Sequence, residues 1–109
     1  MTIEFHNPIG IIKKKEIDFI RDKLIACHHA FDKISRAEVY CKEIKINSEN
    51  NFACTINIDI FENSFYINKT SSSYEASIIS VIEAIEKKVD EWIKESSSTL
   101  DDVLTTIKI

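Results

Sequence analysis

The sequence contains few residues that break or cross-link a chain: its 109 residues include one glycine, one proline and three cysteines. A single glycine leaves no room for a glycine-rich loop that cradles phosphate. The cysteines lie far apart without a C-x-x-C motif, so their spacing fits neither a disulfide framework nor a zinc knuckle. No apolar run approaches the ~20 residues that a membrane-spanning helix needs. These shortages exclude several classes of nucleotide-binding, metal-binding and membrane protein.

The first residues also lack a charged segment followed by an apolar one, which is the pattern of a secretory signal. We therefore expect a cytoplasmic protein that keeps its cysteines reduced and makes no membrane contact. Each of the three cysteines falls on an apolar stripe, where it is expected to be a small buried side chain. A reactive thiol would need a partner, and the spacing of the cysteines does not show one.

What the sequence does contain is apolar and charged residues in the proportions of a folded domain, 44% hydrophobic and 29% charged. The net charge of -4 is unevenly spread. Residues 1–45 hold nine Lys/Arg against seven Asp/Glu, whereas residues 46–109 hold five against eleven. The first part is therefore suited to a polyanionic partner, although the whole chain is not as basic as a typical nucleic-acid-binding protein.

The apolar residues follow two periods along the chain. Alternation with period two predicts strands at residues 2–6, 34–46, 51–61 and 65–70, and polar residues 48–51 predict a turn between the second and third. Apolar residues every three or four positions predict helices over residues 13–31 and 72–95. Ser72 and Glu75 have the spacing of a capping box at the start of the second helix.

This order, β-α-β-β-β-α, predicts an α+β fold. Consecutive strands that are joined by short turns favour an antiparallel meander, and two amphipathic helices must bury their apolar stripes against it. We expect a two-layer sandwich in which both helices pack on one face of a four-stranded sheet. Residues 1–95 form the predicted domain, and residues 96–109 are a predicted C-terminal tail that is either a short helix or disordered.

Two stretches of the sequence resemble a known family. "KKKEIDFIRDKL" leads into "FDKISRAEVYCK", in which Phe31-Asp32-Lys33-Ile34 joins a helix to a strand, and "YEASIISVIEAIEKKV" is a helix with an aromatic start. Over about residues 1–95 this pattern resembles the ribosome hibernation promoting factors, also called ribosome-associated inhibitors. Long members carry a further C-terminal dimerisation domain, so this chain is similar to a short form.

The resemblance implies a translation inhibitor that binds ribosomal RNA in the cleft of the small ribosomal subunit, where mRNA and tRNA pass during translation. Cations would engage the phosphates of structured RNA by shape, without a base code. It implies neither an enzyme nor a cofactor. The basic residues that it marks as RNA-binding candidates are Lys14, Lys15, Arg21, Lys23, Lys33, Arg36, Lys87, Lys88 and Lys94.

A second hypothesis comes from the acidity of the second helix, because five carboxylates share its C-terminal half with Lys87, Lys88 and Lys94. A diverged member would then act as a protein-interaction or regulatory module without strong RNA binding. The tail at 96–109 would be the contact for its protein partner.

Other chemistry-bearing residues carry less specific patterns. His28 and His29 are consecutive and point about 100° apart on a helix, so they do not form a zinc-binding pair. They are interpreted as a solvated helix end, with RNA contact as the alternative. Trp92 ends an apolar stripe, which favours packing over stacking on a base. No arrangement of nucleophile, base and oxyanion donor supports catalysis.

Overall fold

The structure is a computed structural model that describes residues 1–6, 12–60 and 63–108, and for residues 96–108 it describes the backbone alone. The elements are β1 (Thr2–His6), α1 (Lys14–Ala30), β2 (Ile34–Ile46), β3 (Glu49–Ile60), β4 (Asn63–Ser71) and α2 (Tyr74–Lys108). This succession confirms the predicted order β-α-β-β-β-α.

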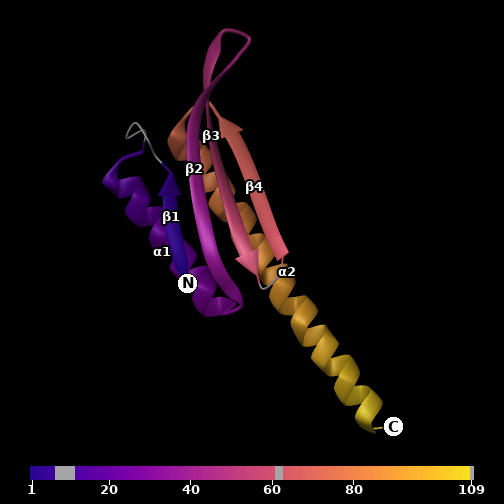
Figure 1. Cartoon of the computed structure of the whole chain (residues 1–109). Helices are drawn as coiled ribbons and strands as arrows, with labels where there is room; N and C mark the ends of the chain where they lie inside the picture. The colour runs from indigo at the N-terminus through magenta and orange to yellow at the C-terminus, as the bar shows by residue number, and fades with distance from the viewer. Residues whose placement is uncertain (7–11, 61–62, 109) are drawn as a thin grey trace.

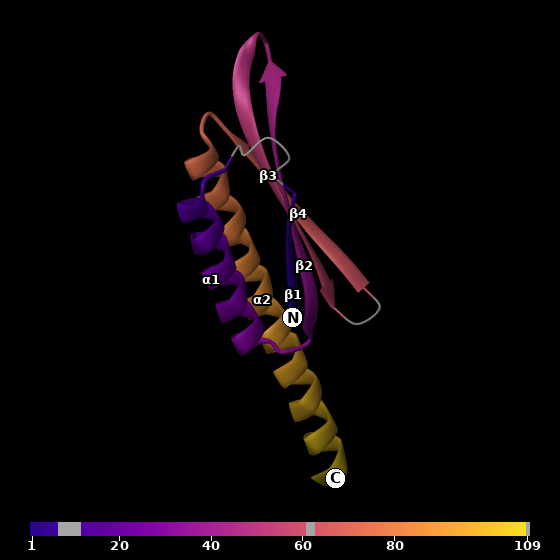
Figure 2. The ribbon, with the colours of Figure 1, turned by 60° about the vertical axis from the view of Figure 1, so that its left-hand side comes forward.

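The four strands form one sheet in the order β1-β2-β3-β4. β1 pairs in parallel with β2 through the α1 crossover, whereas β2, β3 and β4 are antiparallel neighbours. Both helices lie on the same side of this sheet, as Figure 2 shows, and they run next to each other in the same direction. The predicted α+β sandwich with two helices on one face is therefore confirmed.

The core lies between the two layers and follows the predicted periods. On the sheet, Val39 of β2 and Ile56 of β3 are paired neighbours that are almost fully buried. The helix stripes that cover them are also buried, and they consist of Ile20, Leu24 and Cys27 from α1 and Ile78, Val81, Ile82, Ile85, Val89 and Trp92 from α2. The ring of Trp92 packs 5.8 Å from Phe31 and 5.0 Å from Phe65, which confirms its packing role.

The turn between β2 and β3 consists of two residues. Asn47 and Ser48 have φ angles of 51° and 67°, and Ile46 pairs with Glu49 on either side of them. Positive φ at both central positions is the signature of the type I′ hairpin, which matches the right-handed twist of the strands. The turn thus lies earlier than the predicted 48–51, because Glu49 to Asn51 already belong to β3. In Figure 1 the hairpin tip extends beyond the helices.

Helix α2 differs from the prediction at its start. The hydroxyl of Ser73, and not of Ser72, accepts a hydrogen bond from the Ala76 N–H at 3.2 Å. The predicted capping box is therefore wrong: the capping serine lies one position later, and Ala76 has no side chain that could complete a box.

At its other end, α2 continues as one helix to Lys108 and projects past the sheet (Figure 1). The backbone of residues 96–108, predicted as a separate tail, is thus a continuation of α2. Ile109 lies outside the described residues. None of the described helices is long and apolar enough to cross a membrane.

Candidate nucleic-acid interface

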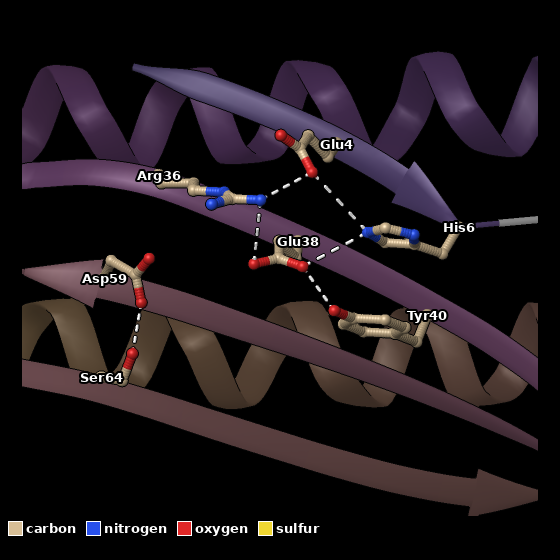
Figure 3. A network of polar contacts seen from close by, with 7 residues as sticks. All are labelled: Glu4, His6, Arg36, Glu38, Tyr40, Asp59 and Ser64. Atoms are coloured by element: carbon tan, nitrogen blue, oxygen red, sulfur yellow. Dashed lines mark hydrogen bonds and ion pairs between the residues drawn. The ribbon is translucent and has the colours of Figure 1, made fainter.

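The nine basic candidates lie on both sides of the sheet. α1 carries Lys14, Lys15, Arg21 and Lys23, α2 carries Lys87, Lys88 and Lys94, Lys33 follows α1, and Arg36 is in β2. Figure 3 shows Arg36 on the face of the sheet that is turned away from the helices. The structure therefore does not bring the nine residues together into one surface.

Arg36 is held in a network of carboxylates on the open face of the sheet (Figure 3). Its Nη2 atom lies 2.7 Å from Glu4 Oε2 of β1 and 3.2 Å from Glu38 Oε1 of β2. The hydroxyl of Tyr40 donates a hydrogen bond to Glu38, and His6 Nε2 lies 3.2 Å from the Glu38 carboxylate. A guanidinium that already faces two carboxylates has little charge left for a phosphate.

The same contacts set the protonation of this network. The hydrogen bond from Tyr40, together with the charge of Arg36, holds the pKa of Glu38 below its usual value. In return, the Glu38 carboxylate raises the pKa of the Tyr40 hydroxyl. The hydrogen bond to Glu4 likewise raises the pKa of Arg36. Glu38 is thus a carboxylate at neutral pH, and the open face carries charges of both signs.

In the part of the chain that the structure describes, Glu4, His6 and Glu38 come nearest to a metal-binding set. One potential ligand atom from each lies within 4.8 Å of the others. A divalent cation would have to displace Arg36 from both carboxylates, since the guanidinium contacts each of them. The donor set therefore does not fit a metal while Arg36 is in place.

On the helices, several of the candidate cations have their own partners. Arg21 pairs with Asp18 at 3.3 Å, and its guanidinium carbon lies 5.3 Å from the centre of the Phe5 ring. Lys88 pairs with Glu91 at 3.4 Å. These are exposed ion pairs that water and salt screen strongly. A phosphate that binds Arg21 or Lys88 must still compete with the carboxylate of Asp18 or Glu91, so it gains less binding energy there than at an unpaired cation.

Lys23 and Lys33 lie beside aromatic rings. The Lys23 ammonium is 5.8 Å from the Phe19 ring, and the Lys33 ammonium is 5.8 Å from the Phe31 ring. Lys23 also lines a groove between α1 and α2, to which α2 contributes Glu86 and Asp90. This groove is therefore mixed in charge rather than basic.

Four candidate lysines are exposed and could bind the phosphate of an external partner without first breaking an ion pair. Among the residues whose side chains the structure describes, none forms an ion pair with Lys14, Lys15, Lys87 or Lys94. Lys14 and Lys15 are exposed in the first turn of α1, where the positive end of the helix dipole adds to their charge. Lys87 and Lys94 are exposed two turns apart on α2.

One further cation was missed by the sequence prediction. Lys69 of β4 and Lys87 of α2 line the same surface hollow, together with Ser80, Glu83 and Ala84. The sheet register places Lys69 opposite Cys54, on the helix side of the edge strand. The signal in the sequence is a lysine within the row of β4 residues that otherwise faces the core, a common way to protect an edge strand. The hollow has two ammonium groups and one carboxylate.

The comparisons with known proteins concern the fold. No model of a protein family matches the sequence, and no curated protein matches it. Among solved structures, a ribosomal subunit interface protein from Coxiella burnetii has a similar fold, with a TM-score of 0.66, 14% identity, and coverage of 86% of this chain and 99% of that chain. The N-terminal domain of Protein Y from Thermus thermophilus is similar with a TM-score of 0.59, 15% identity, and coverage of 84% and 94%.

These solved structures belong to the family that the sequence resembles. At 14% and 15% identity the likeness concerns the course of the backbone, and it extends over most of this chain. The resemblance that rests on Phe31-Asp32-Lys33-Ile34 and on the second helix is thus matched by the folded chain. The chain has the fold of the ribosome hibernation promoting factors.

Proposed function

We propose that this protein binds the ribosome in the cytoplasm and inhibits translation by occupying the mRNA and tRNA cleft of the small ribosomal subunit. The observation that carries the proposal is the fold, which covers 99% of a ribosomal subunit interface protein. The protein acts as a binding protein, without catalysis and without a cofactor. Its partner surface is the ribosomal RNA of the small subunit.

The helices supply the chemistry for such binding. The ammonium groups of Lys14, Lys15, Lys87 and Lys94 form no ion pair with any side chain that the structure describes, and these residues are exposed on α1 and α2. Ammonium groups bind the phosphates of folded RNA without reading its bases, and each contact releases a counterion. Lys69 adds a fifth charge beside Lys87. Arg21 and Lys88 stay in the proposed interface as weaker contacts, because each is paired with a carboxylate of this chain. Arg36 lies on the opposite face of the sheet and is outside this interface.

Co-sedimentation with purified small ribosomal subunits over a salt series tests this function. We expect the bound fraction to fall steeply as salt rises, since the logarithm of the affinity falls in proportion to the number of phosphate contacts. Lys14→Glu combined with Lys15→Glu is expected to weaken binding at least ~10-fold and to flatten the salt dependence. Failure to sediment with the subunit even at low salt would overturn the proposal.

A matched control separates a specific surface from overall charge. Lys42→Glu with Lys45→Glu changes the net charge by the same amount on the exposed hairpin of β2, away from the helices. This pair is expected to bind like the unmodified protein. Equal losses in both double variants would show that net charge and not the α1 surface drives the association.

A second candidate function is a protein-interaction module without strong RNA binding. The observation that favours it is the charge balance: Lys87, Lys88 and Lys94 share their part of α2 with five carboxylates, those of Glu83, Glu86, Asp90, Glu91 and Glu95. The projecting residues 96–108 of α2 would then supply the contact for a protein partner. Pull-down with and without nuclease distinguishes the two functions. A nuclease-resistant protein partner supports the module, and a pull-down that contains ribosomes alone counts against it.

A further inference from the structure

Two of the three cysteines meet across neighbouring strands. Cys41 of β2 lies directly opposite Cys54 of β3 in the antiparallel register. Both are on the side of the sheet that faces the helices, and their exposed fractions are 6% and 0%. Twelve residues separate them in the sequence, so the pairing could not be predicted from their spacing and follows only from the register of the hairpin.

The position of the turn decides which kind of pair they form. Ile46 and Glu49 close the two-residue turn, and closing pairs of such hairpins exchange backbone hydrogen bonds. Hydrogen-bonded and non-hydrogen-bonded pairs alternate along the ladder, so five steps further, at Cys41 and Cys54, the pair is of the non-hydrogen-bonded kind. The Cα atoms of such pairs are about 4.5 Å apart. Disulfides span Cα distances of roughly 4.4–6.8 Å, so the backbone here already has the required spacing.

The two thiols also contact each other. A hydrogen bond between the two thiols lowers the pKa of Cys41 and raises that of Cys54. The thiolate is the nucleophilic form of cysteine. Cys41 is also the more exposed of the two residues, so it is the attacking sulfur of the pair and Cys54 is the resolving thiol.

The surroundings of Cys41 leave part of it accessible and bring a tyrosine hydroxyl into its electrostatic range. Cys41 keeps 6% of its surface exposed, whereas Cys54 is 0% exposed, so a small oxidant reaches Cys41 first. The hydroxyl of Tyr74 is near enough for the Cys41 charge to raise its pKa, although burial is the larger cause. Among the described residues this buried hydroxyl has no hydrogen-bond partner.

We propose that Cys41 and Cys54 are an oxidisable pair that a small peroxide converts into a disulfide between β2 and β3. The Cys41 thiolate attacks one oxygen of hydrogen peroxide, the O–O bond breaks, and the departing hydroxide takes up a proton to become water. The sulfur of Cys54 then attacks the sulfenic acid at Cys41, and its proton leaves with the hydroxyl group as a second water. Both thiols are oxidised, and the peroxide is reduced. The pair does not depend on the function proposed above.

Cys27 provides an internal reference. It lies in α1, with its sulfur in the groove against α2, and it is 6% exposed like Cys41. Burial is the main cause that raises its pKa, and the nearby Glu86 carboxylate adds to the effect. Cys27 has similar burial without a paired thiol, so it is expected to remain reduced under conditions that oxidise the pair.

The test treats the folded, full-length protein with hydrogen peroxide, then denatures it and alkylates the remaining thiols. Intact mass is expected to show that two of the three thiols no longer react, and peptide mapping without reductant is expected to join the peptides of Cys41 and Cys54. Incubation with a dithiol reductant should restore all three. Cys27→Ala should behave like the unmodified protein in losing both thiols of the pair.

Two single variants separate the steps. Cys54→Ser is expected to stop at a sulfenic acid on Cys41, which dimedone traps, whereas Cys41→Ser should leave Cys54 reduced. Circular dichroism verifies that each variant folds, and Cys54→Ala is the second choice where the serine hydroxyl destabilises the core. The unmodified protein alone also decides the question. Three alkylatable thiols after treatment of the folded protein, or a link that includes Cys27, would overturn the proposal.

Discussion

Arg36 in β2 and Glu4 in β1 form an ion pair of 2.7 Å between residues that are 32 positions apart in the sequence. The parallel register that aligns Thr2 with Arg36 brings them together across neighbouring strands. β1 is an edge strand of only five residues, so its side-chain contacts matter for its pairing. The ion pair thus gives Arg36 a structural role in the free protein, in which it stabilises the pairing of β1 with β2.

Replacing Arg36 with Gln should lower stability more than replacing Arg21 does. Arg36→Gln removes the contacts to Glu4 and Glu38 and leaves the largely covered Glu38 carboxylate without its cation. Arg21→Gln loses one exposed pair within α1. Urea unfolding followed by circular dichroism measures both midpoints. Equal midpoints for the two variants would contradict this structural role of Arg36.

The network also predicts a pH dependence of stability. Glu38 has a folded pKa below its usual 4.5, so its stabilising effect is complete above that value and is lost as the pH falls through the folded pKa. Tyr40 has a raised pKa, so its contribution is complete below its usual 10.0 and is lost as the pH rises through the folded value.

Urea midpoints measured from about pH 7 down to about pH 3 and up to about pH 11 show the loss of stability at acidic pH and at alkaline pH, the two limbs of the pH profile. Tyr40→Phe removes the hydrogen bond that is the main cause of both shifts, so it should flatten the acidic and the alkaline limb together. Glu38→Gln should do the same. A Tyr40→Phe protein with unchanged limbs would show that this hydrogen bond does not link the two groups.

The β2–β3 turn offers a stabilising substitution. Ser48 has φ of 67°, a region that costs a residue with a side chain roughly 1–2 kcal/mol and costs glycine almost nothing. Glycine also gives the unfolded chain more freedom, so Ser48→Gly should raise the free energy of unfolding by a net ~0.5 kcal/mol. Ser48→Ala keeps the steric conflict and should give no gain. Chemical denaturation at one pH compares the three proteins.

Ser77 is the one fully buried polar side chain among the residues whose burial is described. Its hydroxyl donates to the backbone carbonyl of Phe52 in β3 and thereby joins α2 to the sheet. Ser77→Ala should lower the free energy of unfolding by about 1–3 kcal/mol, because the carbonyl loses its partner in a dry environment. Ser80→Ala, one turn on and exposed, should change it by less than ~0.5 kcal/mol. Similar losses in both would contradict the role of the buried hydrogen bond, because alanine is itself the better helix former.

The sequence predicted the layers because burial leaves a periodic trace. The alternation through Cys54, Ile56 and Ile58 and the stripe through Ile78, Ile85 and Val89 are buried as expected. Local ends were harder to place, since several serines in succession each satisfy the same rule. Ser73 and not Ser72 caps α2, and the serines at 96–98, which were assigned to the predicted tail, continue α2.

The candidate site was less predictable, because charges have no period and pair across strands. Arg36 was chosen as an RNA-binding candidate from its place in the sequence, but its partner Glu4 follows from the parallel register. Lys69 was missed, since only the edge position of β4 brings it beside Lys87. Cys41 and Cys54 were both predicted to be buried, whereas their contact depends on where the turn falls. RNA binding by the nine residues remains a prediction.

The long α2 helix has a consequence for measurements in solution. The molecule measures 63 × 28 × 22 Å, and its radius of gyration of 16.7 Å exceeds the ~13 Å of a compact domain of this length. An elongated particle diffuses more slowly than a sphere of equal mass. A monomer of 12.6 kDa should therefore elute from a gel-filtration column ahead of globular standards of its own mass. Sedimentation equilibrium, which is insensitive to shape, is the method that will count its copies correctly.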